Sequence, residues 1–291
     1  MLSKIQNLLY SCYGENTTDK LPDIRFQLFL TAVKSMMPYE DKIGCYLDLK
    51  RYNNEIELLK LYKNGRDDSL ESYLKTSKAG EEEDKLMEYK ILPAVIANTE
   101  WDNIVNEAVK AATFFSVSNT TILDSILLSS AVHDFLKEED AEYDVIEKNA
   151  KERLIDFSLK EYSQKNNFEL NKRNIIDYER ERIKKISTSD IYSEDYIQKF
   201  SLLRHIFNMN AAVGEYNEEL LSSYSSYLLK LRKGIISPEK LKMPEGRIPE
   251  LREFFKSQTF SHPLLGKCKI VKRSEEYVVL RNKTGLMKVN I

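Results

Sequence analysis

Apolar residues are most concentrated over residues 91–136, where their spacing predicts two helices joined by a polar turn. In the first helix, over residues 101–115, apolar side chains recur on one face only. In the second, over residues 122–136, they lie on more than one face. Because a helix that is apolar on nearly every side cannot lie on a surface, we expect residues 122–136 to form the centre of the fold.

The start of the helix over residues 101–115 is marked by a capping pattern in the sequence. Thr99 followed by Asp102 has the spacing of a capping box, so the helix is expected to begin there. Its polar face is expected to carry Asn103, Asn106, Glu107 and Lys110.

Helical spacing also covers most of the remaining chain. Pro38 and Pro93 are expected to end helices, and Gly14, Gly214 and Gly234 are expected to follow helix ends. These further helices are predicted over residues 2–13, 22–37, 41–63, 69–76, 81–92, 143–163, 168–186, 194–213 and 216–233.

After residue 258 the apolar residues no longer follow the helical period. The segments KCKIVKR, EYVVLRN and LMKVN are short and rich in β-branched and aromatic residues, and NKTG supplies a turn between the last two. They predict a three-stranded antiparallel meander, which is too small to be stable unless it packs on the helices. We therefore expect a mainly α protein. A single large orthogonal multi-helix domain would span residues 1–258, and a β appendage would span residues 259–291.

Charge and hydropathy narrow the possible partners and location. The 291 residues include 44 basic and 46 acidic side chains, a formal net charge of −2. This near neutrality argues against nonspecific nucleic-acid binding, although a local patch could survive it, so no nucleic-acid partner is expected. The amino terminus lacks the apolar run of a signal peptide, and no apolar run reaches the roughly 18 residues that span a bilayer. We therefore expect a cytoplasmic protein with no membrane contact.

Candidate chemistry is sparse. His133, His205 and His262 lack the clustered spacing of a zinc site; the first two are expected to be buried and hydrogen-bonded, and the third is expected in an exposed loop. Asp67 and Asp68 form an acidic pair that helix capping explains at least as well as catalysis. No glycine-rich phosphate loop and no nucleophile-elbow motif is present, and the three cysteines are expected to be packing residues.

The order of four segments can be compared with a known family. LLYSCYGE ends the first helix, LPDIRF opens the second, YKILPAV follows a long helical excursion, and FSVSNTT precedes the central helix. In this order, over roughly residues 1–235, the chain resembles the all-helical ADP-ribosylglycohydrolase family. That family has a Gly-rich turn, a Thr-Asp-Asp-Thr element, an Arg-x-x-Pro element and a Thr-His turn at the corresponding places. Here the elements are degenerate. Asp23 stands where two aspartates are expected, Lys90 stands near the arginine, the Thr-His pair is missing, and no later Asp-x-Asp-Thr element is visible.

The resemblance implies a divergent member of this family. Family members hydrolyse ADP-ribosyl bonds with two magnesium ions, which need several converging carboxylates. Because Asp23 alone cannot hold two ions, we expect no di-magnesium hydrolase activity and no cofactor. The chain could still bind ADP-ribose or a related nucleotide, either without turning it over or with a changed mechanism. Arg25 would pair with the diphosphate, and Ser and Asn side chains would bond ribose hydroxyls. The residues that would line this cleft are Asp23, Arg25, Ser116, Ser118, Asn119 and Asp124.

A second hypothesis assigns the protein to a different functional class. The helical body would be a protein-interaction or regulatory scaffold with no small-molecule chemistry, and the charged helices over residues 143–186 or the edge of the meander would form its contact surface. An exposed apolar patch on either element would favour the scaffold. A concave pocket lined by Asp23, Arg25 and Asn119 would favour nucleotide binding. The sequence leaves both hypotheses open.

Overall fold

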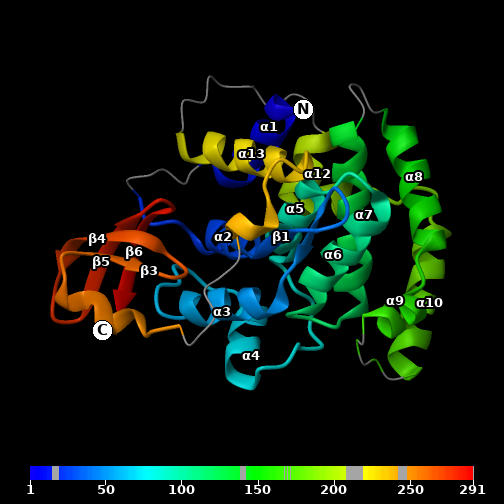
Figure 1. The fold of residues 1–291 in the computed structure, drawn as a ribbon. Coiled ribbons are helices and arrows are strands. Elements are labelled where there is room, and N and C mark those ends of the chain that lie inside the picture. The colour runs from blue at the N-terminus through cyan, green and yellow to red at the C-terminus, as the bar shows by residue number, and fades with distance from the viewer. Residues whose placement is uncertain are drawn as a thin grey trace.

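The computed structural model describes residues 1–14, 20–137, 142–166, 168, 170, 172–207, 219–241 and 248–290. This part of the chain is mainly α-helical and ends in a small antiparallel sheet, as predicted (Figure 1). The helices are α1 (Leu2–Tyr13), α2 (Ile24–Ser35), α3 (Leu49–Leu59), α4 (Asp68–Thr76), α5 (Met87–Ala97), α6 (Trp101–Thr113), α7 (Asn119–Lys137), α8 (Tyr143–Asp156), α9 (Leu159–Lys165), α10 (Lys172–Ile186), α11 (Glu194–Lys199), α12 (Ser201–Phe207) and α13 (Glu219–Arg232). The strands are β1 (Met36–Pro38), β2 (Cys45–Leu47), β3 (Thr259–His262), β4 (Gly266–Arg273), β5 (Tyr277–Asn282) and β6 (Gly285–Asn290), and the 3-10 helices are η1 (Pro238–Leu241) and η2 (Leu251–Lys256).

Two helices, α5 and α7, pack against each other at the centre of the molecule (Figure 1). The prediction for α7 is confirmed, because Ile126, Leu127 and Leu128 point in successive directions around the helix and all are fully buried. The expectation that Pro93 ends a helix is wrong. Pro93 lies inside α5, and every residue of α5 is buried. This burial offsets the hydrogen bond that a proline removes from a helix.

The other helices surround this pair (Figure 1). Helices α2 and α6 pack on α5, α1 and α13 lie against each other on one side, and α8 and α10 cover α7 on another. Buried apolar side chains from α1 to β6 form one continuous cluster, so the sheet shares the core of the helical body. Among the residues described, no helix combines the length and the apolar character that crossing a membrane requires.

Residues 41–63 do not form the single helix predicted for them. Strands β1 and β2 pair as an antiparallel hairpin, and α3 begins only at Leu49. Two local features explain the difference. Gly44 has a φ of +129°, a conformation that favours glycine. The Asp48 carboxylate accepts the Arg51 N–H at 3.0 Å and thereby caps α3.

The capping box predicted at Thr99 is absent. Helix α6 begins directly after Glu100, whose side chain makes no capping hydrogen bond. The predicted polar face of α6 is also partly buried. Glu107 has no exposed surface, and its carboxylate accepts the Leu47 N–H at 2.7 Å and bonds Lys110 at 2.8 Å. Polar residues of α6 therefore anchor strand β2.

Two of the predicted long helices are interrupted by phenylalanines. Phe157 separates α8 from α9, and Phe200 separates α11 from α12. Both residues are buried and extended, so inserting the ring into the core ends each helix. The predicted helix end at Gly214 lies outside the described residues. Gly234 follows α13 with a φ of +65°, which fits the predicted C-cap.

The C-terminal sheet has four strands in the order β3-β4-β5-β6, not three. Strand β3 was not predicted because four residues are too few to display alternation. The sheet is attached to the body beside α3, where the Asn290 N–H donates to the Leu61 carbonyl at 3.3 Å. The buried residues of its inner face include Cys268, Ile270, Val278, Leu280, Met287 and Val289.

Candidate functional site

Two of the six residues expected to line a nucleotide cleft lie at the start of α2. Asp23 caps this helix, because its Oδ1 accepts the Phe26 N–H at 2.9 Å. Its Oδ2 accepts a hydrogen bond from Arg25 Nη2 at 2.6 Å. A diphosphate would therefore have to compete with Asp23 for the Arg25 guanidinium.

Three more of these residues lie at the start of α7. Ser116 is fully buried, and its Oγ donates to the Glu82 carbonyl at 2.5 Å. The Ser118 carbonyl accepts an N–H of the first turn of α7 at 3.0 Å. The Asn119 amide donates to Glu181 at 3.5 Å. These contacts hold the loop before α7 in place, and the side chains of Ser116 and Asn119 already have structural partners.

Asp124, the sixth residue, is a buried carboxylate in an ionic cluster whose other charged members, Lys199 and Glu83, are partly exposed. Its carboxylate accepts hydrogen bonds from Tyr196 Oη at 2.8 Å and from Lys199 Nζ at 2.7 Å. Lys199 Nζ also lies 2.5 Å from Glu83 Oε1. Burial raises the pKa of the Asp124 carboxyl above its ordinary value, and the Lys199 ammonium opposes this shift. The lysine thus bridges two carboxylates from separate segments.

A second cluster of this kind was not predicted. Lys90 is fully buried, and its Nζ lies 2.6 Å from both Asp67 and Asp84 and 4.2 Å from the centre of the Phe115 ring. The predicted capping role of Asp67 is confirmed, since it accepts the Leu70 N–H at 3.1 Å. The carboxylates outweigh the effect of burial and raise the pKa of Lys90. The sequence feature that could have indicated this cluster is Lys90, a single lysine in a helix otherwise rich in apolar residues.

These clusters do not fit the two magnesium ions that the resemblance to ADP-ribosylglycohydrolases would imply. Between each pair of carboxylates lies a lysine ammonium, at the place where a cation would have to bind. Within the described part of the chain, no group of three or more His, Cys, Asp or Glu side chains is arranged to hold a metal ion. A magnesium ion would have to displace a lysine that is held by ion pairs.

The histidines differ from the predictions in part. His133 is buried as expected, but its Nδ1 has no hydrogen-bond partner among the described residues. Burial, together with the nearby Arg153 guanidinium, lowers the pKa of His133 to about 4. His205 is only partly buried. The expectation that His262 is exposed is wrong, because the ring is 1% exposed and packs beneath the loop that follows β3.

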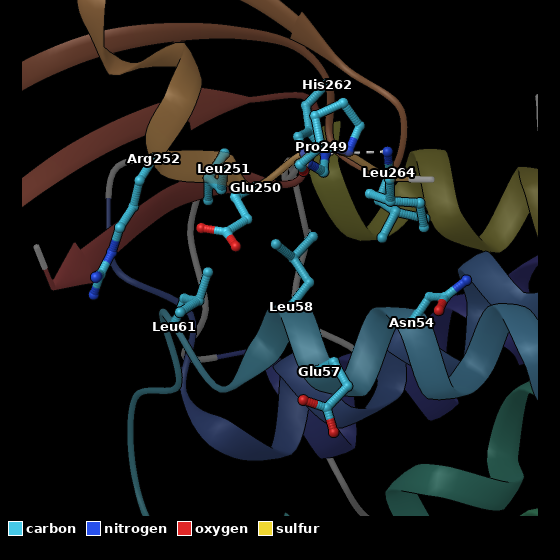
Figure 2. A pocket seen from close by; sticks show the side chains of 11 residues that line it. Asn54, Glu57, Leu58, Leu61, Pro249, Glu250, Leu251, Arg252, His262 and Leu264 are labelled. Atoms are coloured by element: carbon cyan, nitrogen blue, oxygen red, sulfur yellow. Dashed lines mark hydrogen bonds between the residues drawn. The ribbon is translucent and has the colours of Figure 1, made fainter. Parts of the chain in front are cut away.

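A cavity of about 360 Å³ lies between α3 and the chain segments that enter and leave β3 (Figure 2). Leu58 and Leu61 line it from the α3 side, and Leu251 and Leu264 line it from the opposite side. In Figure 2, Leu58 points across the gap toward the appendage. Glu57, Glu250 and Arg252 also line the cavity; in Figure 2 the Glu250 carboxylate lies in the gap, whereas the Glu57 carboxylate points away from it. None of the six residues expected for a nucleotide cleft lines this cavity.

The buried His262 fixes one wall of the cavity. Its Nδ1 accepts the Leu264 N–H at 3.2 Å, so in the neutral ring the proton lies on Nε2. Nε2 lies 3.3 Å from the Pro249 carbonyl and can donate to it. Burial lowers the pKa of His262, which favours this neutral form. The ring therefore joins the segment before η2 to the end of β3.

Comparison with known proteins adds no assignment. The chain matches no family model, no curated protein and no solved structure.

Proposed function

We propose that this protein is a non-catalytic binding protein, a helical scaffold that receives an apolar group of its partner in the cavity between α3 and the appendage. The observation that carries the proposal is the cavity itself. A volume of about 360 Å³ falls within the roughly 300–1,000 Å³ of ligand pockets. When an apolar group displaces water from the leucine-lined walls of the cavity, the free energy of the complex is lowered.

The charged residues of the cavity favour a cationic neighbour for that apolar group. The residues that line the cavity include two glutamates, Glu57 and Glu250, and one arginine, Arg252. Arg252 Nη2 donates to the Asn290 carbonyl at 3.3 Å, which directs it toward β6. A partner segment with a leucine-sized side chain beside a lysine or arginine meets both requirements.

The absence of catalysis is supported by the lysines between the carboxylates. Lys199 forms ion pairs with both Asp124 and Glu83, and Lys90 forms ion pairs with both Asp67 and Asp84. Nucleotide binding at the family's cleft is less favoured, because Arg25 is engaged by Asp23. These contacts support a divergent ADP-ribosylglycohydrolase-like body that retains the helical framework without its magnesium chemistry.

The test uses two small probes of the same shape and opposite charge. Titration with 4-phenylbutylamine, followed by isothermal calorimetry, is expected to show saturable binding at one site, whereas 4-phenylbutyrate binds more weakly. Replacement of Leu61 by Trp fills the cavity and is expected to abolish binding. Leu74→Trp, at another half-buried leucine on α4, is the matched control. Equal binding of the amine to both variants would overturn the proposal.

A further inference from the structure

The outer face of the C-terminal sheet differs in charge from the rest of the molecule. Residues 259–291 contain seven lysines and arginines and two glutamates, whereas the whole chain has a net charge of −2. Both glutamates precede β5, and no strand of the sheet contains an acidic residue. The helical body is therefore net acidic and the appendage is net basic.

The strand register gathers five of these seven basic side chains on one face. Lys269 of β4 is opposite Arg281 of β5, and Lys272 of β4 and Lys288 of β6 both lie opposite Val279. Alternate residues of a strand point to the same side. The two rows therefore share the outer face, and the basic residues Lys267, Lys269, Lys272, Arg281 and Lys288 are all exposed.

A β-bulge makes this arrangement possible. Lys269 and Lys272 are three positions apart, so a regular strand would place them on opposite faces. The register of β4 against β5 shifts between Ile270 and Lys272. The extra residue, Val271, resets the alternation and brings Lys272 onto the same face as Lys269.

Between the cations lies an apolar and aromatic surface. Tyr277 shares the outer face with Val279, and its ring centre lies 4.3 Å from Lys288 Nζ and 5.7 Å from Lys272 Nζ. Val279 and Leu286 are half-buried on the same face. A surface that alternates cations with an aromatic ring suits a ligand that has both anionic groups and flat rings.

We propose that the outer face of this sheet binds single-stranded nucleic acid, with its lysines on the phosphates and Tyr277 beneath a base. This activity goes beyond the proposed binding of an apolar group, because that cavity lies elsewhere, against α3. The proposal also departs from the expectation of no nucleic-acid partner. That expectation rests on the net charge of the whole chain, in which the acidic helical body offsets the basic appendage. When phosphates engage the two lysines, the ring that these lysines flank becomes available for stacking. An acidic peptide would satisfy the lysines but leave the ring unused.

The test measures binding of fluorescein-labelled oligouridylate and oligothymidylate of roughly 16 nucleotides by fluorescence anisotropy at low salt. Saturable binding is expected for both, since the phosphate backbone is their shared feature. With about four phosphates contacted, the logarithm of affinity is expected to fall with the logarithm of salt concentration with a slope near −3. A labelled polyglutamate peptide of equal length is tested beside them.

Charge-reversal variants locate the site. The triple variant Lys269→Glu, Lys272→Glu, Lys288→Glu is expected to weaken binding by about tenfold or more. The control triple variant, Lys148→Glu, Lys160→Glu, Lys184→Glu, changes net charge equally on the exposed surfaces of α8, α9 and α10. It is expected to retain binding within about threefold. Thermal unfolding of both triple variants establishes that each one folds.

A second pair of variants tests the ring. Tyr277→Ala is expected to weaken binding by about tenfold, and Tyr277→Phe to preserve it. Absence of saturable binding at low salt, equal loss in the two triple variants, or tighter binding of polyglutamate than of either oligonucleotide would overturn the proposal.

Discussion

The ammonium of Lys90 lies 2.6 Å from the Asp84 carboxylate, and neither side chain is exposed to solvent. Asp67 binds the same ammonium at 2.6 Å. This lysine therefore joins the start of α4, the segment before α5, and α5 itself. Because buried charges are costly unless paired, the cluster is held together only while all three members remain.

Replacement of Lys90 by Met is expected to lower the free energy of unfolding by about 3–5 kcal/mol, since it leaves two buried carboxylates unpaired. Urea denaturation measures the change. Lys85→Met, at an exposed lysine in the preceding turn, is the control and is expected to stay within about 0.5 kcal/mol. A loss below about 1 kcal/mol in Lys90→Met would show that the carboxylates are not buried as described.

Gly44→Ala is expected to destabilise the β1–β2 hairpin by about 1–3 kcal/mol. The glycine has a φ of +129°, and a Cβ atom there would lie 2.6 Å from Asn98 Oδ1. Gly80→Ala is the matched control, because the nearest atom to its added Cβ is 3.7 Å away. Equal midpoints of thermal unfolding in the two variants would contradict the described hairpin.

His133 is expected to make stability depend on pH. Burial lowers its pKa from 6.5 to about 4, so between these values the unfolded chain binds the proton more readily than the folded one. This contribution is fully present above about pH 6.5 and is lost as the pH falls toward 4, with an upper limit of about 3 kcal/mol.

His133→Gln removes this titration. Urea denaturation at a series of pH values is expected to show a smaller loss of stability in the variant than in the wild type between neutral pH and pH 4.5 or so. Identical pH profiles would show that His133 is accessible to water and protons in the folded state.

ADP-ribose at millimolar concentration, with or without magnesium, is expected to leave the midpoint of thermal unfolding unchanged. The reason is that Asp23 engages Arg25, and Lys199 bridges Asp124 and Glu83. A ligand present at about 100 times its dissociation constant would stabilise the protein by about 2.7 kcal/mol, which a shifted midpoint reveals. A shift with ADP-ribose alone would favour a nucleotide-binding module, and a shift that needs magnesium would favour an enzyme.

Much of the fold follows from apolar periodicity, and the exceptions have local causes. The burial of Ile126, Leu127 and Leu128 could be predicted because α7 is apolar on several faces. The hairpin before α3 and strand β3 could not, since strands of three or four residues are too short to show alternation. The breaks at Phe157 and Phe200 depend on where each ring finds space in the core, which periodicity does not encode.

The candidate site was less predictable than the fold. The family resemblance predicts Asp23 and Asp124 at a nucleotide cleft, but both side chains have internal partners. The cavity is lined by Leu58 and Leu264, which are about 200 positions apart in the chain and lie on opposite sides of it only because the sheet packs on α3. His262 is buried for the same tertiary reason.

The most direct test of the central claim is a crystal structure of the protein soaked with both 4-phenylbutylamine and magnesium chloride. The phenyl ring is expected between Leu58 and Leu264, the amine toward Glu57 or Glu250, and the Lys199 ammonium still between Asp124 and Glu83. An empty cavity together with magnesium ions bound by Asp124 and Glu83 would contradict the proposed function, and would identify the carboxylates as a working metal site.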